Sequence, residues 1–133
     1  MNSKIFFVIL IILAGVIIFG TTLKPKNELL TQNKTMGVVD VKITPVSVDN
    51  NKELVFELVM DNHSIDLSYD YTKIAVLTDN NDNSIYPSSW TGNSSGHHVE
   101  GKLLFPSFSK NPKELTLTLN GVDNKIEAFN WKL

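Results

Sequence analysis

The sequence contains no cysteine, and this absence excludes several kinds of site. Disulfides, zinc sites with thiolate ligands, blue-copper centres and cysteine nucleophiles all need this residue. A lipoprotein is excluded as well, because there is no cysteine to acylate. The absence of cysteine is also compatible with a protein that folds outside the cytoplasm without oxidative help.

Arginine is absent too, so all 12 basic residues are lysines. This argues against bidentate clamps on phosphate or carboxylate groups, which depend on the guanidinium fork. An AT-rich genome explains the same bias, because asparagine and isoleucine are also abundant. The net charge is −2 and the isoelectric point is about 5.9, so nothing in the composition predicts a surface for nucleic acid.

A long apolar stretch opens the chain. Residues 5–20 carry no charged or strongly polar side chain, and extension to residue 23 gives about 19 residues. As a helix this stretch would measure about 28 Å, close to the thickness of the hydrocarbon core of a bilayer. We therefore predict a transmembrane anchor at residues 5–23 after a cytoplasmic leader at 1–4. The alternative is a cleaved signal peptide, although the stretch is longer than usual and no A-x-A-like site follows it.

The positive charges on the two sides of this anchor are nearly balanced, so charge alone does not fix its orientation. Lys4 lies before it, and Lys24 and Lys26 lie after it. A short leader easily remains in the cytoplasm, so we expect a single-pass protein of the cell membrane with its C-terminal domain outside. Residues 24–36 are polar and lack periodicity, which predicts a linker.

From residue 37 to 133 the apolar side chains alternate with polar ones, and none of this part has a helical pattern. Alternation of this kind predicts strands with one face in a core. Turn-forming residues such as those at 79–83 and 120–124 separate the runs. The pattern predicts an all-β domain, an immunoglobulin-like antiparallel β-sandwich of about seven strands. These strands are expected near residues 39–43, 54–61, 73–78, 84–86, 99–105, 115–119 and 129–133.

Two polar patches contain every histidine of the chain. His63 lies between Asp61 and Asp66, and His97 and His98 precede an apolar strand. If the patches meet, two or three imidazoles and a carboxylate would suit zinc or copper(II). Neighbouring residues of a regular strand point to opposite faces, so both adjacent histidines could ligate one ion only from a loop or bulge.

Two methionines could add a thioether ligand to such a copper site, namely Met36 and Met60, although methionine in an apolar strand usually belongs to the core. The alternative for the whole group is that its polar side chains only bond to loops and to one another. The sequence lacks the C-x-x-C and H-E-x-x-H spacings of specific metal sites. Metal binding through the three histidines is therefore kept as a hypothesis, with zinc or copper as the possible ion.

No motif predicts an enzyme. Residues 79–84 resemble a calcium loop, but an EF-hand needs Gly where Ser84 stands and Glu where Trp90 stands, so we predict a hairpin turn there. No G-x-S-x-G motif or organised triad is present. Trp90 and Trp131 are expected to seal the core.

Several motifs together resemble a family of uncharacterised extracytoplasmic domains of bacteria and archaea that are attached to the membrane or envelope. These motifs are D-x-H-S-[V/I]-D-L at residues 61–67, W-x-G at 90–92, G-H-H-x-x-G-x-L-x-F-P at 96–106 and F-x-W-x-L at 129–133. The resemblance covers about residues 38–133 and implies the fold and the location. Domains of this kind sometimes occur beside redox or metal-handling partners, so the resemblance implies such a partner as one possibility. The sequence departs from the family pattern at one point, because Gly96 alone precedes the histidines where the resemblance leads us to expect two glycines.

Two functions remain open on these grounds. The first is a membrane-anchored extracytoplasmic module without catalysis that binds an envelope protein or supports an envelope assembly. The alternative is a copper- or zinc-binding envelope module that uses the three histidines.

Overall fold

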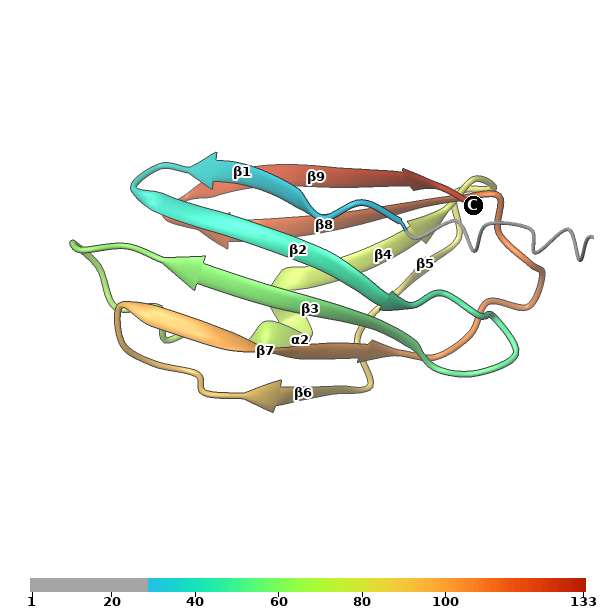
Figure 1. The fold of residues 1–133 in the computed structure, drawn as a ribbon, viewed down its shortest axis with the longest axis horizontal. Coiled ribbons are helices and arrows are strands. Elements are labelled where there is room, and N and C mark those ends of the chain that lie inside the picture. The colour runs from blue at the N-terminus through green and yellow to red at the C-terminus, as the bar shows by residue number, and fades with distance from the viewer. Residues whose placement is uncertain (1–28) are drawn as a thin grey trace, which may run out of the picture.

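The structure, a computed structural model, describes residues 29–133 as two antiparallel β-sheets that face each other (Figure 1). One sheet has five strands in the order β1-β2-β3-β7-β6, and the other has four in the order β5-β4-β8-β9. A short helix, α2, lies between β3 and β4. The elements are β1 (Gln32–Met36), β2 (Val39–Ser47), β3 (Leu54–Asp61), α2 (Tyr71–Ile74), β4 (Ala75–Asp79), β5 (Ser84–Ile85), β6 (Ser89–Gly92), β7 (His98–Phe105), β8 (Glu114–Val122) and β9 (Lys125–Lys132).

The predicted fold, a seven-stranded immunoglobulin-like sandwich preceded by a transmembrane helix, is corrected by this architecture. Residues 29–133 form nine strands, two of which, β1 and β6, the sequence pattern did not reveal. Both are edge strands made mostly of polar residues, so they lack the alternation that marks a strand with one buried face. Strand β1 occupies the last five residues of the predicted linker, so the sheet begins earlier than expected.

The predicted anchor at residues 5–23 lies outside the described residues. Within residues 29–133, no helix is long and apolar enough to cross a membrane.

The core fills the space between the two sheets, because alternate residues of the long strands point inward. Phe56 lies at its centre, with its ring 5.9 Å from that of Phe105 and 5.3 Å from that of Trp131. The first contact joins two strands of the five-stranded sheet, and the second joins that sheet to β9. The larger inward-facing residues are Met36, Ile43, Leu54, Phe56, Leu58, Met60, Leu77, Leu103, Phe105, Leu115, Leu117, Leu119, Phe129 and Trp131.

Trp90 and α2 close the other side of this core. The ring of Trp90 is half-buried and stacks on Tyr71 with 4.5 Å between the centroids. A Cβ atom at Gly101 would lie 2.6 Å from the ring of Trp90, so only glycine leaves room for it. The side chain of Asp70 accepts a hydrogen bond from the backbone N–H of Thr72 and thereby caps α2. This glycine and this tryptophan therefore serve the fold, as expected for Trp90 and Trp131.

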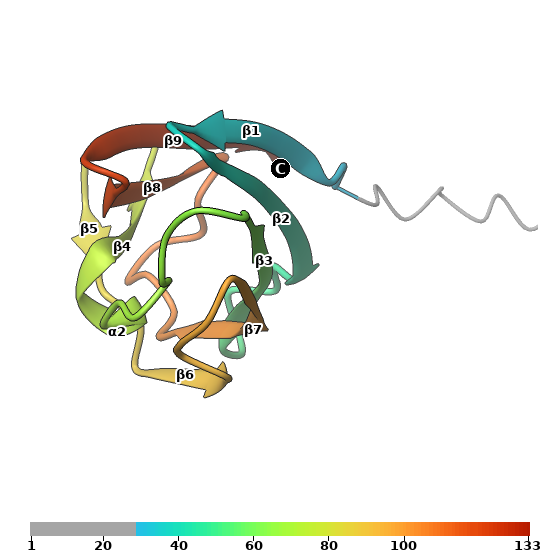
Figure 2. The same ribbon diagram turned by 90° about the vertical axis from the view of Figure 1, so that its left-hand side faces the viewer.

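Side chains of β1 bridge the two sheets along one edge, where β1 runs beside β9 (Figures 1 and 2). The backbone N–H of Asn130 donates to the side-chain oxygen of Gln32 at 3.3 Å, and Gln32 donates back to the carbonyl of Asn130. The ammonium of Lys34 donates to the carbonyl of Ala128 at 2.6 Å and pairs with Glu127 at 3.0 Å. The free edge of β9 is thus covered by side chains, which protects it from pairing with another chain.

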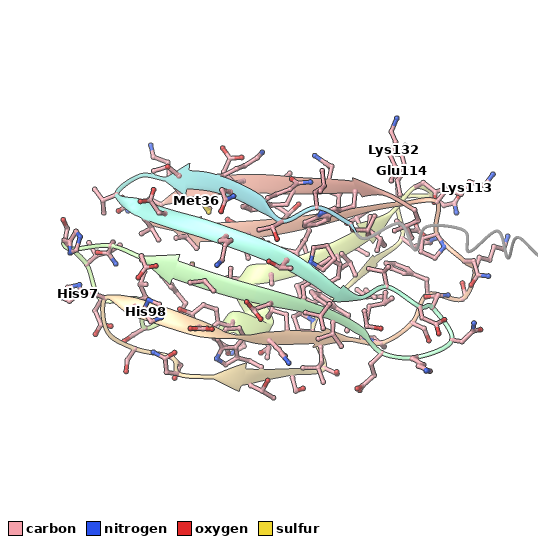
Figure 3. The ribbon with its side chains drawn as sticks, in the orientation of Figure 1. Met36, His97, His98, Lys113, Glu114 and Lys132 are labelled. Atoms are coloured by element: carbon pink, nitrogen blue, oxygen red, sulfur yellow. The ribbon has the colours of Figure 1, made fainter. Side chains whose placement is uncertain are left out.

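The two ends of the sandwich differ in what they carry (Figure 1). Leu29 and the C-terminal Leu133 lie at one end, which we call the terminal end. The segments 61–67 and 92–98 lie at the opposite end, and we call these two segments the loop end. The histidines labelled in Figure 3 lie at the loop end, and Lys113, Glu114 and Lys132 lie at the terminal end.

Replacement of Phe56 by alanine is expected to lower the free energy of unfolding by about 3–5 kcal/mol, because it removes the ring that links both sheets. Urea unfolding of the purified chain in mild detergent measures this change. Tyr86→Ala is the control, since this aromatic side chain is 62% exposed, and its effect should stay within about 0.5 kcal/mol. Equal losses for the two variants would show that Phe56 does not hold the sheets together.

Candidate functional site at the loop end

The pairing of β3 with β7 continues beyond the sheet and joins the two segments of the loop end. Asp61 and His98 are the last partners of the ladder. Beyond them, the N–H of Asn62 donates to the carbonyl of His97 at 3.0 Å, and the N–H of Leu67 donates to the carbonyl of Gly96 at 2.8 Å. Backbone hydrogen bonds therefore hold both loops in one fixed arrangement.

Asn62 is the internal support of this arrangement. It is one of two polar residues in the described part of the chain that are buried, with 7% exposure. Its side-chain oxygen accepts from the N–H groups of Ser64 and Ile65, each at 2.7 Å. Its amide nitrogen donates to the carbonyl of Ile65 at 3.0 Å and to that of His97 at 3.4 Å. A polar side chain that is buried and fully bonded fixes a loop strongly, since any loosening leaves unpaired groups.

Asp66 ties the second segment to the first from the outside. Its carboxylate accepts from the N–H of Gly96 at 2.7 Å and from the hydroxyl of Ser68 at 2.9 Å. The hydrogen bond from Gly96 is the largest cause of a pKa below the usual value for this carboxyl. Gly96 has a φ of 96°, a left-handed conformation that favours glycine. The ring of His97 adds a further link between the two segments, because its Nδ1 donates to the carbonyl of Ile65 at 2.9 Å.

His98 lies between two carboxylates on the outer face of the five-stranded sheet. Its Nδ1 is 2.5 Å from Oδ1 of Asp61, and its Nε2 is 3.5 Å from Oε2 of Glu100. The pKa of His98 is raised, chiefly by the hydrogen bond with Asp61 and then by the charge of the same carboxylate. Asp40 is the partner of Asp61 on the next strand, so a protonated His98 also offsets repulsion between two carboxylates.

The predicted metal ligands are brought to the same end of the molecule but do not converge. Asp61 meets His98, Asp66 meets the backbone of Gly96, and His63 is exposed on the loop. Within residues 29–133, no group of three or more histidine and acidic side chains is placed to hold an ion.

The thioether ligands considered for copper lie elsewhere. Met36 and Met60 are buried in the core, with 1% and 0% exposure. Their sulfur atoms therefore do not face the histidines in solvent, and the donor set does not fit a copper site with a methionine ligand.

The sequence missed two residues of the site, Asn62 and Glu100. The local signal for Asn62 is its position directly after a strand, where asparagine often bonds the backbone two residues on. Glu100 is placed two residues beyond His98 on the same face of β7, as the period of a strand requires. The predicted hairpin at residues 79–84 is confirmed, because Asp79 bonds the N–H groups of Asn81 and Asn83 and β4 pairs with β5.

The chemistry of the loop end is that of an exposed surface. Asp61, His98 and Glu100 are all more than half exposed in their side chains. A hollow of about 380 Å³ lies beside them on the outer face of β1–β3, with Asp40 and Asp61 in its lining. Such groups can form hydrogen bonds and ion pairs with another molecule, but they do not enclose a substrate.

Comparison with known proteins gives a likeness of fold. No protein-family model matches the sequence of this chain, and no curated protein matches it. Among solved structures, a DUF4426 family protein from Pseudomonas aeruginosa PAO1 is similar, with a TM-score of 0.50 and 14% sequence identity. The match covers 77% of this chain and 96% of that one. At this identity it supports the architecture alone, and the family resemblance based on motifs stays a prediction.

Replacement of Asn62 by alanine should lower the free energy of unfolding by about 1–3 kcal/mol, because two partly buried N–H groups lose their acceptor. Urea unfolding measures the loss. Asn33→Ala is the matched control, since this asparagine is exposed on β1. If both variants unfold at the wild-type urea concentration, Asn62 does not support the loop end.

Replacement of Asp61 by asparagine should lower the pKa of His98, as followed by NMR titration of the imidazole. Glu100→Gln should lower it less, because Glu100 is the weaker cause of the shift. Pairing raises the pKa of His98 in the folded state, so the pair stabilises the fold fully below the unfolded pKa of about 6.5. That contribution is lost as the pH rises through the folded pKa. An unchanged pKa in Asp61→Asn would contradict the pairing.

Proposed function

We propose that this protein is a binding module without catalysis, attached to the outer face of the cell membrane through residues 5–23. Its loop end contacts a protein partner in the envelope. The observation that carries the proposal is the combination of exposure and rigidity at the loop end. Exposed groups of His97, His98 and Asp66 are fixed by hydrogen bonds, and the buried side chain of Asn62 supports the backbone beneath them.

Rigidity of this kind favours binding. Association loses less conformational entropy when the contacting groups are ordered beforehand. A loop that served only to connect two strands would not need a buried asparagine bonded to both segments. Loops held on a rigid β-scaffold are also common binding surfaces in other proteins.

The charge of the loop end indicates the partner's character. Asp61 and Asp66 are exposed within its two segments, and Asp40 and Glu100 are exposed on the adjoining strands β2 and β7. When His98 is neutral, the surface is acidic, so we expect the partner to present lysines, arginines or other hydrogen-bond donors. Attachment by residues 5–23 places such a partner in the envelope, which agrees with the location implied by the family resemblance.

Catalysis is less well supported by this geometry. The carboxylates of the loop end face water, and no enclosed pocket converges on them within the described residues. Catalytic acids and bases usually lie in clefts that exclude water and shift their pKa values by burial. Here the pKa shifts of Asp66 and His98 arise mainly from hydrogen bonds at the surface.

Photo-crosslinking in intact cells tests the proposal. A photoreactive amino acid in place of Ser64 or Ser95 should give a discrete protein adduct, because both side chains are exposed at the loop end. The same probe at Asn111, which is exposed and lies two residues before Lys113 of the terminal end, is the control and should not give that adduct. Asn62→Ala should reduce the adduct from either loop position. Adducts of equal yield from Asn111, or none from the loop end, would overturn the proposal.

A further inference from the structure

We propose that the terminal end of the domain rests against the lipid headgroups, with Leu30 and Val46 in contact with the bilayer interface. The inference rests on the proposed attachment through residues 5–23. It adds a second interaction surface, for lipid, at the end of the molecule opposite to the partner surface.

The surface is a groove between the first described residues and the end of β2, where apolar side chains lie among polar ones such as Thr31, Thr44 and Ser47. Its volume is about 830 Å³, and its lining includes Leu29, Leu30, Pro45, Val46, Val48 and Lys52. Leu30 is 81% exposed and Val46 is 50% exposed. Large apolar side chains grouped at an exposed groove mark a contact surface more often than isolated ones do.

The length of chain before the groove argues for lipid as the occupant. The apolar stretch ends at residue 23, and only the five residues 24–28 separate it from Leu29. Five extended residues span at most about 18 Å. With residues 5–23 in the bilayer, the groove cannot lie far above the headgroup layer.

The residues that directly follow this short connection are already bonded to the folded domain. The indole N–H of Trp131 donates to the carbonyl of Leu30 at 2.7 Å, and Gln32 bonds the backbone of Asn130. The backbone of Leu30 is therefore part of the folded domain. Its side chain, which points into solvent, is carried at a fixed place next to the membrane-attached segment.

Charge adds little to this contact. Lys113 and Lys132 lie at the terminal end, as does Glu114 (Figure 3). At the groove itself, Lys52 is accompanied by Asp49. Because basic and acidic side chains are mixed, the apolar residues provide the attraction, and binding should depend weakly on anionic lipid.

The absence of cysteine makes a direct test possible, since one introduced cysteine is the only thiol in the chain. The full chain is reconstituted in vesicles of phosphatidylcholine and phosphatidylglycerol that contain a lipid with a nitroxide headgroup. A fluorophore is attached at Leu30→Cys or Val46→Cys. Ile126→Cys is the matched control, because Ile126 is an apolar residue with 65% exposure at the start of β9, a strand that runs toward the terminal end.

The labels at positions 30 and 46 should shift to the blue and lose most of their fluorescence to the nitroxide lipid. The label at 126 should remain quenchable only by a water-soluble quencher. Equal behaviour at 46 and 126 in chains that float with the vesicles would overturn the inference and leave the attachment intact. Protection of position 46 from both quenchers would show that this chain or a second copy fills the groove, which also overturns it. Chains that do not float with the vesicles would instead contradict the proposed attachment.

Discussion

The antiparallel pairing of β3 with β7 is the constraint on which the rest of this structure depends. It runs from Leu54 opposite Phe105 to Asp61 opposite His98 without a shift in register. Because side chains alternate along both strands, the same register sends Phe56 and Phe105 into the core and leaves Asp61 and His98 outside. A slip by one residue would reverse both sets. The core and the candidate site are therefore consequences of one alignment.

The two ends of the sandwich carry different kinds of surface. At the loop end, hydrogen bonds replace apolar burial, with Asn62 bonded to both loop segments. At the terminal end, apolar side chains such as Leu30 and Val46 remain exposed beside the first described residue. This difference between the two ends fits a module held at one end and bound by its partner at the other. Side chains of β1 cover the edge of β9 and so protect that edge from pairing with another chain.

The sequence predicted what depends on local pattern and missed what depends on pairing. Alternation identified the long strands, because each has one face in the core. It failed for β1 and β6, which are short and carry one large apolar residue each, and for α2, which is a single turn that begins after Asp70.

The candidate site shows the same division. Strand parity correctly separated the two neighbouring histidines, since His98 faces Asp61 while His97 turns to the carbonyl of Ile65. The metal hypothesis required the two polar patches to meet, and they do meet at the loop end, where His98 lies beside Asp61 and Glu100. Asp61 could be named as a partner only after β3 was aligned with β7, whereas Glu100 follows from the two-residue period of β7 itself. Amide hydrogen exchange tests the central claim of a rigid loop end most directly. The account predicts slow exchange at Asn62, Leu67 and Gly96, compared with the exposed Ser94 in the same loop. Exchange of all four at the rate of Ser94 would contradict it.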